Sequence, residues 1–141
     1  MKTAIVAGVI TLALFAVSCG RKTGGNSAPT GKAIATAKAG DLTATLSNST
    51  GQLKQGDQEV ILSFSNSSNQ PVDVGAVSLN FHMPAMGSMA AMNDTVTFTT
   101  TGTPGVYRGK VNVAMAGEWQ GQLAWEGAAG KGKTTFSVTA R

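Results

Sequence analysis

The sequence predicts an all-β domain, an immunoglobulin-like β-sandwich of about seven strands, from three observations. Apolar and polar residues alternate with a period of two from residue 41 onward. Turn-forming segments rich in Gly, Asn, Ser and Pro separate the alternating stretches. Charged residues make up only 13% of the chain, and Gly accounts for 18 of its 141 residues. This composition excludes a coiled coil and argues against a helical bundle.

The predicted strands follow one another along the chain. They centre on residues 42–46, 60–64, 77–81, 96–98, 107–113, 119–125 and 134–138. Trp119 and Trp125 share the phase of Leu123, so we expect all three side chains in the core. Met115 continues the phase of Val113 and is expected there too.

The first 18 residues have the pattern of a secretory signal peptide. Lys2 precedes an apolar run over residues 5–17, which is shorter than the ~20 residues that a membrane-spanning helix needs. The run ends at Ser18 and Cys19, which resembles the lipobox of bacterial lipoproteins. That resemblance implies lipidation of Cys19 and an extracytoplasmic, membrane-anchored protein. Ordinary secretory cleavage, which would leave a free thiol, is the alternative.

Between the anchor and the sandwich, residues 19–40 are predicted to be the lipidated cysteine and a flexible linker of Gly, Ser, Ala, Thr and Lys. The β-sandwich domain is predicted over residues 41–141. Cys19 is the only cysteine, so disulfides and zinc–thiolate sites are excluded. The net charge of +4 is scattered along the chain, which indicates a solvated surface and no nucleic-acid partner.

One cluster stands out from this β-domain. Four methionines lie within ten residues, at every third position, directly after the only histidine. Pro84 and Gly87 argue against a regular strand here, and a period of three aligns side chains in a polyproline II or 3₁₀ segment. Thioether sulfur is soft and suits Cu(I), and imidazole also binds copper. The predicted metal ligands are His82, Met83, Met86, Met89 and Met92.

Other roles are open for these residues. Met83 continues the apolar phase of Phe81 and fits the core, whereas His82 has the opposite phase. The two can face one way only if the strand breaks at His82, which Pro84 permits. The remaining methionines could form an apolar contact surface for a protein partner. Trp119 could alternatively stack on bound Cu(I) as a cation–π partner.

Three segments resemble the YtkA-like/FixH-like family of extracytoplasmic β-sandwich domains, and the resemblance covers residues 41–141. They are the run from Phe81 to Met86 with the methionines behind it, Pro104 to Tyr107, and Met115 to Trp119. The resemblance implies a role in copper handling or in respiratory-oxidase assembly. The ligands it carries over are the five predicted above. Family sites built with additional histidines are not reproduced, because this chain has a single histidine.

Catalysis is not expected. His82 is the only candidate imidazole base, and the carboxylates form no paired motif. Two alternative non-catalytic functions are open. One is a membrane-tethered protein that holds Cu(I) and exchanges it with a donor or acceptor protein. The other is a non-metal binding or assembly module that uses the methionine loop as an apolar surface.

Overall fold

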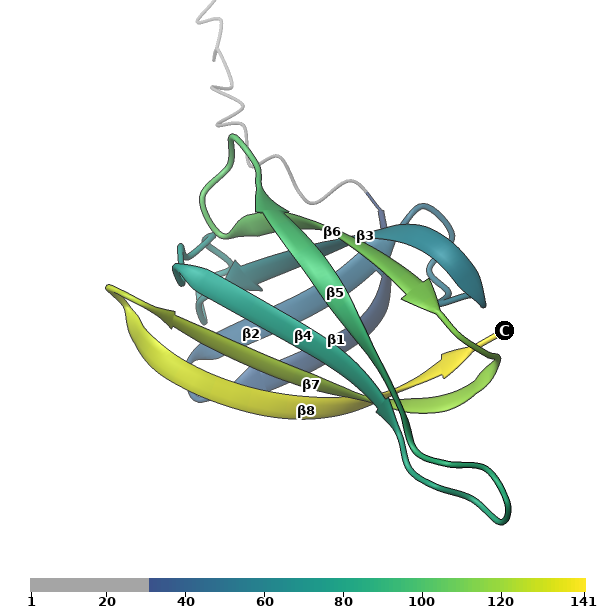
Figure 1. Cartoon of the computed structure of the whole chain (residues 1–141). Coiled ribbons are helices and arrows are strands. Elements are labelled where there is room, and N and C mark those ends of the chain that lie inside the picture. Colours follow the sequence, from purple (N-terminus) through teal and green to yellow (C-terminus); the bar gives the residue numbers. More distant parts are fainter. Residues whose placement is uncertain (1–30) are drawn as a thin grey trace, which may run out of the picture.

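The computed structural model describes residues 31–141, and all of its regular structure is β-strand (Figure 1). The predicted signal peptide and Cys19 lie outside the described residues. The eight strands are β1 (Lys32–Ala39), β2 (Leu42–Asn48), β3 (Gly56–Ser65), β4 (Ala76–Met83), β5 (Met92–Thr100), β6 (Val106–Val113), β7 (Gly117–Gly127) and β8 (Gly130–Ala140). Among residues 31–141 no helix is long and apolar enough to span a membrane.

All strand pairs are antiparallel, in the order β1-β2-β3-β6-β5-β4-β7-β8. The sheet folds into two layers, with β5 running from one layer to the other (Figure 1). Its outer strands approach each other, since Thr134 Oγ1 of β8 donates to the Lys38 carbonyl of β1 at 3.5 Å. The sheet is therefore nearly closed, and the prediction of an all-β, sandwich-like fold is confirmed.

Strand β1 was not predicted. It lies within residues 19–40, the range that the sequence assigned to the linker, so the folded domain begins before residue 41. Four of the eight residues of β1 are Ala, the others are two Lys, one Thr and one Ile, and Ala37 is its only buried residue. Ile34 is the only large apolar residue of the strand, and a register shift between Ala33 and Ala35 interrupts the period of two. The strand is held by its pairing with β2 and by the packing of Ile34 and Ala39 against the core.

The core follows the predicted alternation. Val60, Leu62 and Phe64 of β3 face inward, as do Leu79 and Phe81 of β4. The three β7 residues predicted for the core, Trp119, Leu123 and Trp125, are also buried, and Met115 packs against the core at its edge.

Aromatic rings dominate one part of this core. Phe64 meets Trp125 with ring centroids 5.5 Å apart and Tyr107 with centroids 6.1 Å apart, both edge to face. A second group of rings covers glycines on neighbouring strands. A Cβ on Gly121 would lie 2.4 Å from the ring of Phe136, its register partner. The ring thus leaves room only for glycine at position 121. In the sequence this residue looks like no more than a gap in the apolar alternation.

Tyr107 ties β6 to the segment before β4. Its hydroxyl donates to the Gly75 carbonyl at 2.9 Å and to Asp73 Oδ1 at 3.2 Å. Burial, together with the neighbouring Asp73 carboxylate, raises the pKa of the Tyr107 phenol above its ordinary value of 10.0. The fold therefore favours the protonated phenol.

We expect Tyr107→Phe to lower the free energy of unfolding by about 1–3 kcal/mol, because it leaves the Gly75 carbonyl without this partner. The pH dependence should change as well. The stabilisation from the raised pKa is complete below pH 10.0 and is lost as the pH rises through the folded-state value. Urea unfolding at neutral and alkaline pH measures both effects. Equal alkaline loss of stability in the variant and the wild type would contradict this role.

Candidate metal site

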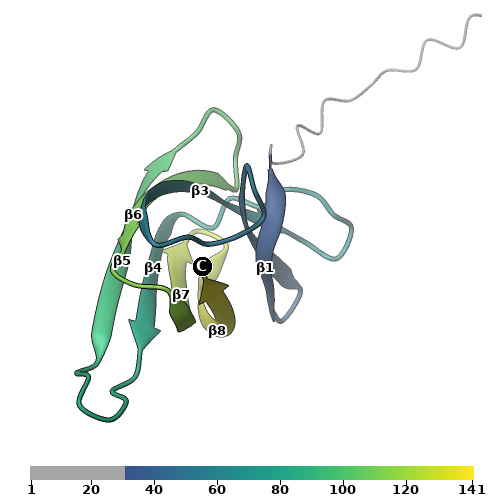
Figure 2. The same cartoon turned by 90° about the vertical axis from the view of Figure 1, so that its right-hand side faces the viewer.

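The methionine cluster lies on the hairpin that joins β4 to β5. Figures 1 and 2 both show the loop of this hairpin extending beyond the body of the sandwich. Strand β4 ends at Met83 and β5 begins at Met92, so residues 84–91 form the loop. All five predicted metal ligands therefore lie in the loop or within two residues of it.

A tight turn closes the loop. Met86 N donates to the Met89 carbonyl at 3.1 Å, and Met89 N donates to the Met86 carbonyl at 2.9 Å. Of the two residues between them only Gly87 has positive φ, at 57°, which is the pattern of a type II′ turn. The predicted polyproline II or 3₁₀ segment is therefore wrong. Met86 and Met89 nevertheless share a face, because directly paired residues project to the same side.

Both methionines of the turn are open to solvent. Met86 is 55% exposed and Met89 is 42% exposed, and they are the only exposed large apolar side chains among residues 31–141. Met86 also lines a small cavity of about 210 Å³ against β7 and β8. The other lining residues are Pro84, Glu118, Trp119, Gln120 and Ser137. Met86 therefore faces the outer surface of these two strands.

His82 and Met83 face opposite sides of the sheet. Strand β4 continues through both residues, so the break at His82 that would have aligned them does not occur. Met83 is buried, and its Cε lies 2.9 Å from where a Cβ would stand on Gly117. Met92 is the register partner of Met83 and packs against the same core. Met83 and Met92 thus form an inner pair.

His82 lies on the outer face, between Asn93 of β5 and Gln120 of β7 in register. Its Nδ1 is 2.9 Å from Asn93 Oδ1. Gln120 also lines the cavity beside Met86, so His82 and the turn methionine border the same outer surface. The structure divides the predicted ligands into an outer group, which comprises His82, Met86 and Met89, and the inner pair.

The described chain offers no alternative built from harder ligands. Within residues 31–141, no three His, Cys, Asp or Glu side chains are close enough to hold a metal ion. Glu118 is the only carboxylate that lines the cavity beside Met86. The predicted core position of Trp119 is confirmed: it is 1% exposed, and its Nε1 donates to the Met115 carbonyl at 3.1 Å.

A family profile described as YtkA-like matches residues 36–124 of the chain. The chain belongs to the YtkA-like family. The match begins within β1, spans β2 to β6 with the methionine hairpin, and ends in β7. The resemblance seen in the sequence is thereby confirmed. Comparisons with curated proteins and with solved structures give no match.

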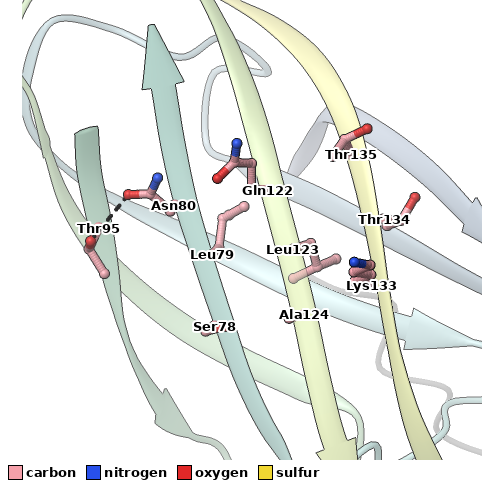
Figure 3. Close-up of a pocket in the computed structure, with 10 residues that line it drawn as sticks. All are labelled: Ser78, Leu79, Asn80, Thr95, Gln122, Leu123, Ala124, Lys133, Thr134 and Thr135. Atoms are coloured by element: carbon pink, nitrogen blue, oxygen red, sulfur yellow. Dashed lines mark hydrogen bonds between the residues drawn. The ribbon is translucent and has the colours of Figure 1, made fainter. Parts of the chain in front are cut away.

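Around its histidine, the YtkA-like domain carries polar residues that the sequence analysis did not single out. Asn80 and His82 share the outer face of β4, and Asn93 and Thr95 stand opposite them on β5. Farther along this face lies a cavity of about 710 Å³, lined by both polar and apolar residues of β4, β5, β7 and β8 (Figure 3). The alternation of Asn80 and His82 in the sequence could have indicated this polar face. Their partners on β5 could not be identified in the same way, because the pairing depends on strand register.

Proposed function

We propose that this YtkA-like protein binds Cu(I) outside the cytoplasm and exchanges it with a partner protein. The ligands are His82 with Met86 and Met89. The observation that carries the proposal is the turn that holds two exposed thioethers on one face, on the side of the sheet where His82 lies. Soft thioethers and a neutral imidazole form a ligand set that suits Cu(I) better than hard divalent cations.

The proposal reduces the five predicted ligands to three. Met83 and Met92 contact the core on the opposite face, and drawing either one outward would leave a cavity there. Their role in the proposal is to anchor the base of the hairpin. The ligand set can then form by movement of the loop alone, without disturbing the sandwich.

Exchange with a partner is supported by the exposure of the turn. Met86 and Met89 project from a loop that extends beyond the body of the domain, where a second protein can reach them (Figure 2). The copper handling and respiratory-oxidase assembly implied by the family resemblance give the class of partner. The role is binding and transfer of the metal, with no catalytic step.

A second function is favoured by the same exposure. Met86 and Met89 could serve as an apolar contact surface in an assembly module that holds no metal. The two functions differ in their need for sulfur. An apolar contact survives replacement of Met by Leu, whereas copper coordination does not.

Anaerobic titration with Cu(I) against a competing chelator tests the proposal. The protein should carry Cys19→Ser, because Cys19 is the only cysteine in the chain and its thiol, in any molecule that is not lipidated, would itself bind Cu(I). We expect one Cu(I) to bind per chain. Failure of the protein to withdraw any Cu(I) from a weak chelator would contradict the copper function and leave the contact surface.

The proposed lipid anchor gives a separate prediction. Cys19→Ser should abolish lipidation, so that unprocessed precursor accumulates or the protein moves to the soluble fraction. Fractionation of cells that express each form, with detergent partition of the membranes, measures the change. The lipid anchor is refuted if the mature variant still partitions into detergent as the wild type does.

A further inference from the structure

The imidazole of His82 is held by a hydrogen bond from one of its nitrogens. His82 and Asn93 are direct register partners on the outer face, and His82 Nδ1 lies 2.9 Å from Asn93 Oδ1. Amide oxygen has lone pairs and no proton, so in this pair the proton belongs to Nδ1. With Asn93 Oδ1 as the acceptor, a neutral His82 ring is the Nδ1–H tautomer and its Nε2 carries a free lone pair.

A short network couples the orientation of the Asn93 amide to that of Asn80. Its Oδ1 also accepts a hydrogen bond from Asn80 Nδ2 at 3.1 Å. The Oδ1 of Asn80 in turn accepts from Thr95 Oγ1 at 3.3 Å, as Figure 3 shows. Turning Asn93 alone would set two NH₂ groups against each other. The two amides therefore keep one orientation relative to each other along the chain of bonds that ends at His82, and the Thr95 hydroxyl is its other end.

We infer that Asn93 is a positioning residue that keeps His82 Nε2 unprotonated and available to a metal ion. This inference rests on the proposed Cu(I) function. Histidines that bind metals commonly donate their other ring N–H to a polar partner, which fixes the tautomer and the ring orientation. Asn93 supplies that partner as a neutral amide, so it adds no charge to the outer group.

Asn93 can play this role only if the proton of the neutral His82 ring is on Nδ1. Reversing both amides would reverse every bond in the network, with Thr95 as acceptor and the proton on His82 Nε2. That arrangement would block the nitrogen on which the inference depends. The tautomer of His82 therefore reports directly on the direction of the network, without any copper in the sample.

The test combines NMR of the metal-free Cys19→Ser protein, labelled with ¹⁵N in its single histidine, with Cu(I) competition titrations. At about pH 8 the wild-type network should give the Nδ1–H tautomer. Asn93→Ala should shift His82 toward the Nε2–H form and lower Cu(I) affinity about 10–100-fold. Asn93→Asp keeps an acceptor oxygen at the same place and should retain the Nδ1–H tautomer. Asn80→Ala should have a smaller effect in the same direction as Asn93→Ala.

Two results would overturn the inference. One is an Nε2–H tautomer in the protein with Asn93 in place. The other is an Nδ1–H tautomer with unchanged Cu(I) affinity in Asn93→Ala, which would remove the positioning role while leaving the copper function intact. Failure of the copper function itself looks different, because the Nδ1–H tautomer would then be present in a protein that takes up no Cu(I). In that case the proposed Cu(I) function fails, and the inferred role of Asn93 fails with it.

Discussion

Replacing Met86 and Met89 together by Leu is expected to remove most of the Cu(I) affinity while the protein stays folded. Leu and Met have similar volume, and such swaps usually cost less than about 1.5 kcal/mol of stability. The cost should be smaller here, since both side chains are exposed. Both sulfur ligands are lost, so the fall in affinity should exceed the ~10–100-fold that loss of an outer-shell partner produces. Anaerobic competition titration measures it.

The chain provides a matched control in the same hairpin. Met92→Leu makes the same chemical change on the inner face, beside Met83. We expect it to leave Cu(I) affinity within a factor of about three, or ~0.6 kcal/mol. The reason is that Met92 packs against the core and is not one of the proposed ligands. Unchanged affinity in the Met86/Met89 double variant would exclude this turn as the copper site. Partner binding that survives the double substitution, in a protein that takes up no Cu(I), would favour the contact surface.

Trp119→Ala is expected to cost about 3–5 kcal/mol of the free energy of unfolding. Trp119 is the largest of the fully buried side chains and lies on β7 between β4 and β8. The substitution opens a cavity that the surrounding strands can close only partly. It also removes the Nε1 donor that satisfies the Met115 carbonyl. Urea unfolding followed by circular dichroism measures the loss.

Gln122→Ala is the control for this experiment. Gln122 lies on the same strand, and its exposed side chain points outward. Surface substitutions of this kind usually change stability by no more than about 0.5 kcal/mol. A loss below about 1 kcal/mol for Trp119→Ala would contradict the core position of this residue.

Most of the fold could be predicted from alternation alone. The segments of β3, β4, β6 and β7 each place large apolar residues at alternate positions, and burial follows that phase closely, as in Val60, Leu62 and Phe64. Strand β1 escaped prediction because its apolar residues are mostly Ala and because a register shift between Ala33 and Ala35 interrupts the period of two. The need for glycine at Gly121 also escaped, because it arises from the ring of Phe136 on the next strand.

Some features of the candidate site could be predicted from the sequence, and others could not. The spacing of three does bring Met86 and Met89 to one face, but through a two-residue turn and not through a threefold helix. The phase of Met83 with Phe81 correctly indicated the core. No pattern in the sequence shows that His82 meets Asn93, because their contact depends on the register of strands joined by an eight-residue loop.

The most direct test of the copper site follows each methionine separately. Protein labelled with ¹³C at the methionine methyl groups, with Cys19→Ser to remove the thiol, is titrated anaerobically with one equivalent of Cu(I), and single Met→Leu variants assign the signals. The proposed site predicts that the methyl signals of Met86 and Met89 shift together with the imidazole signals of His82, while those of Met83 and Met92 stay in place. Shifts at Met83 or Met92, with Met86 and Met89 unmoved, would contradict it.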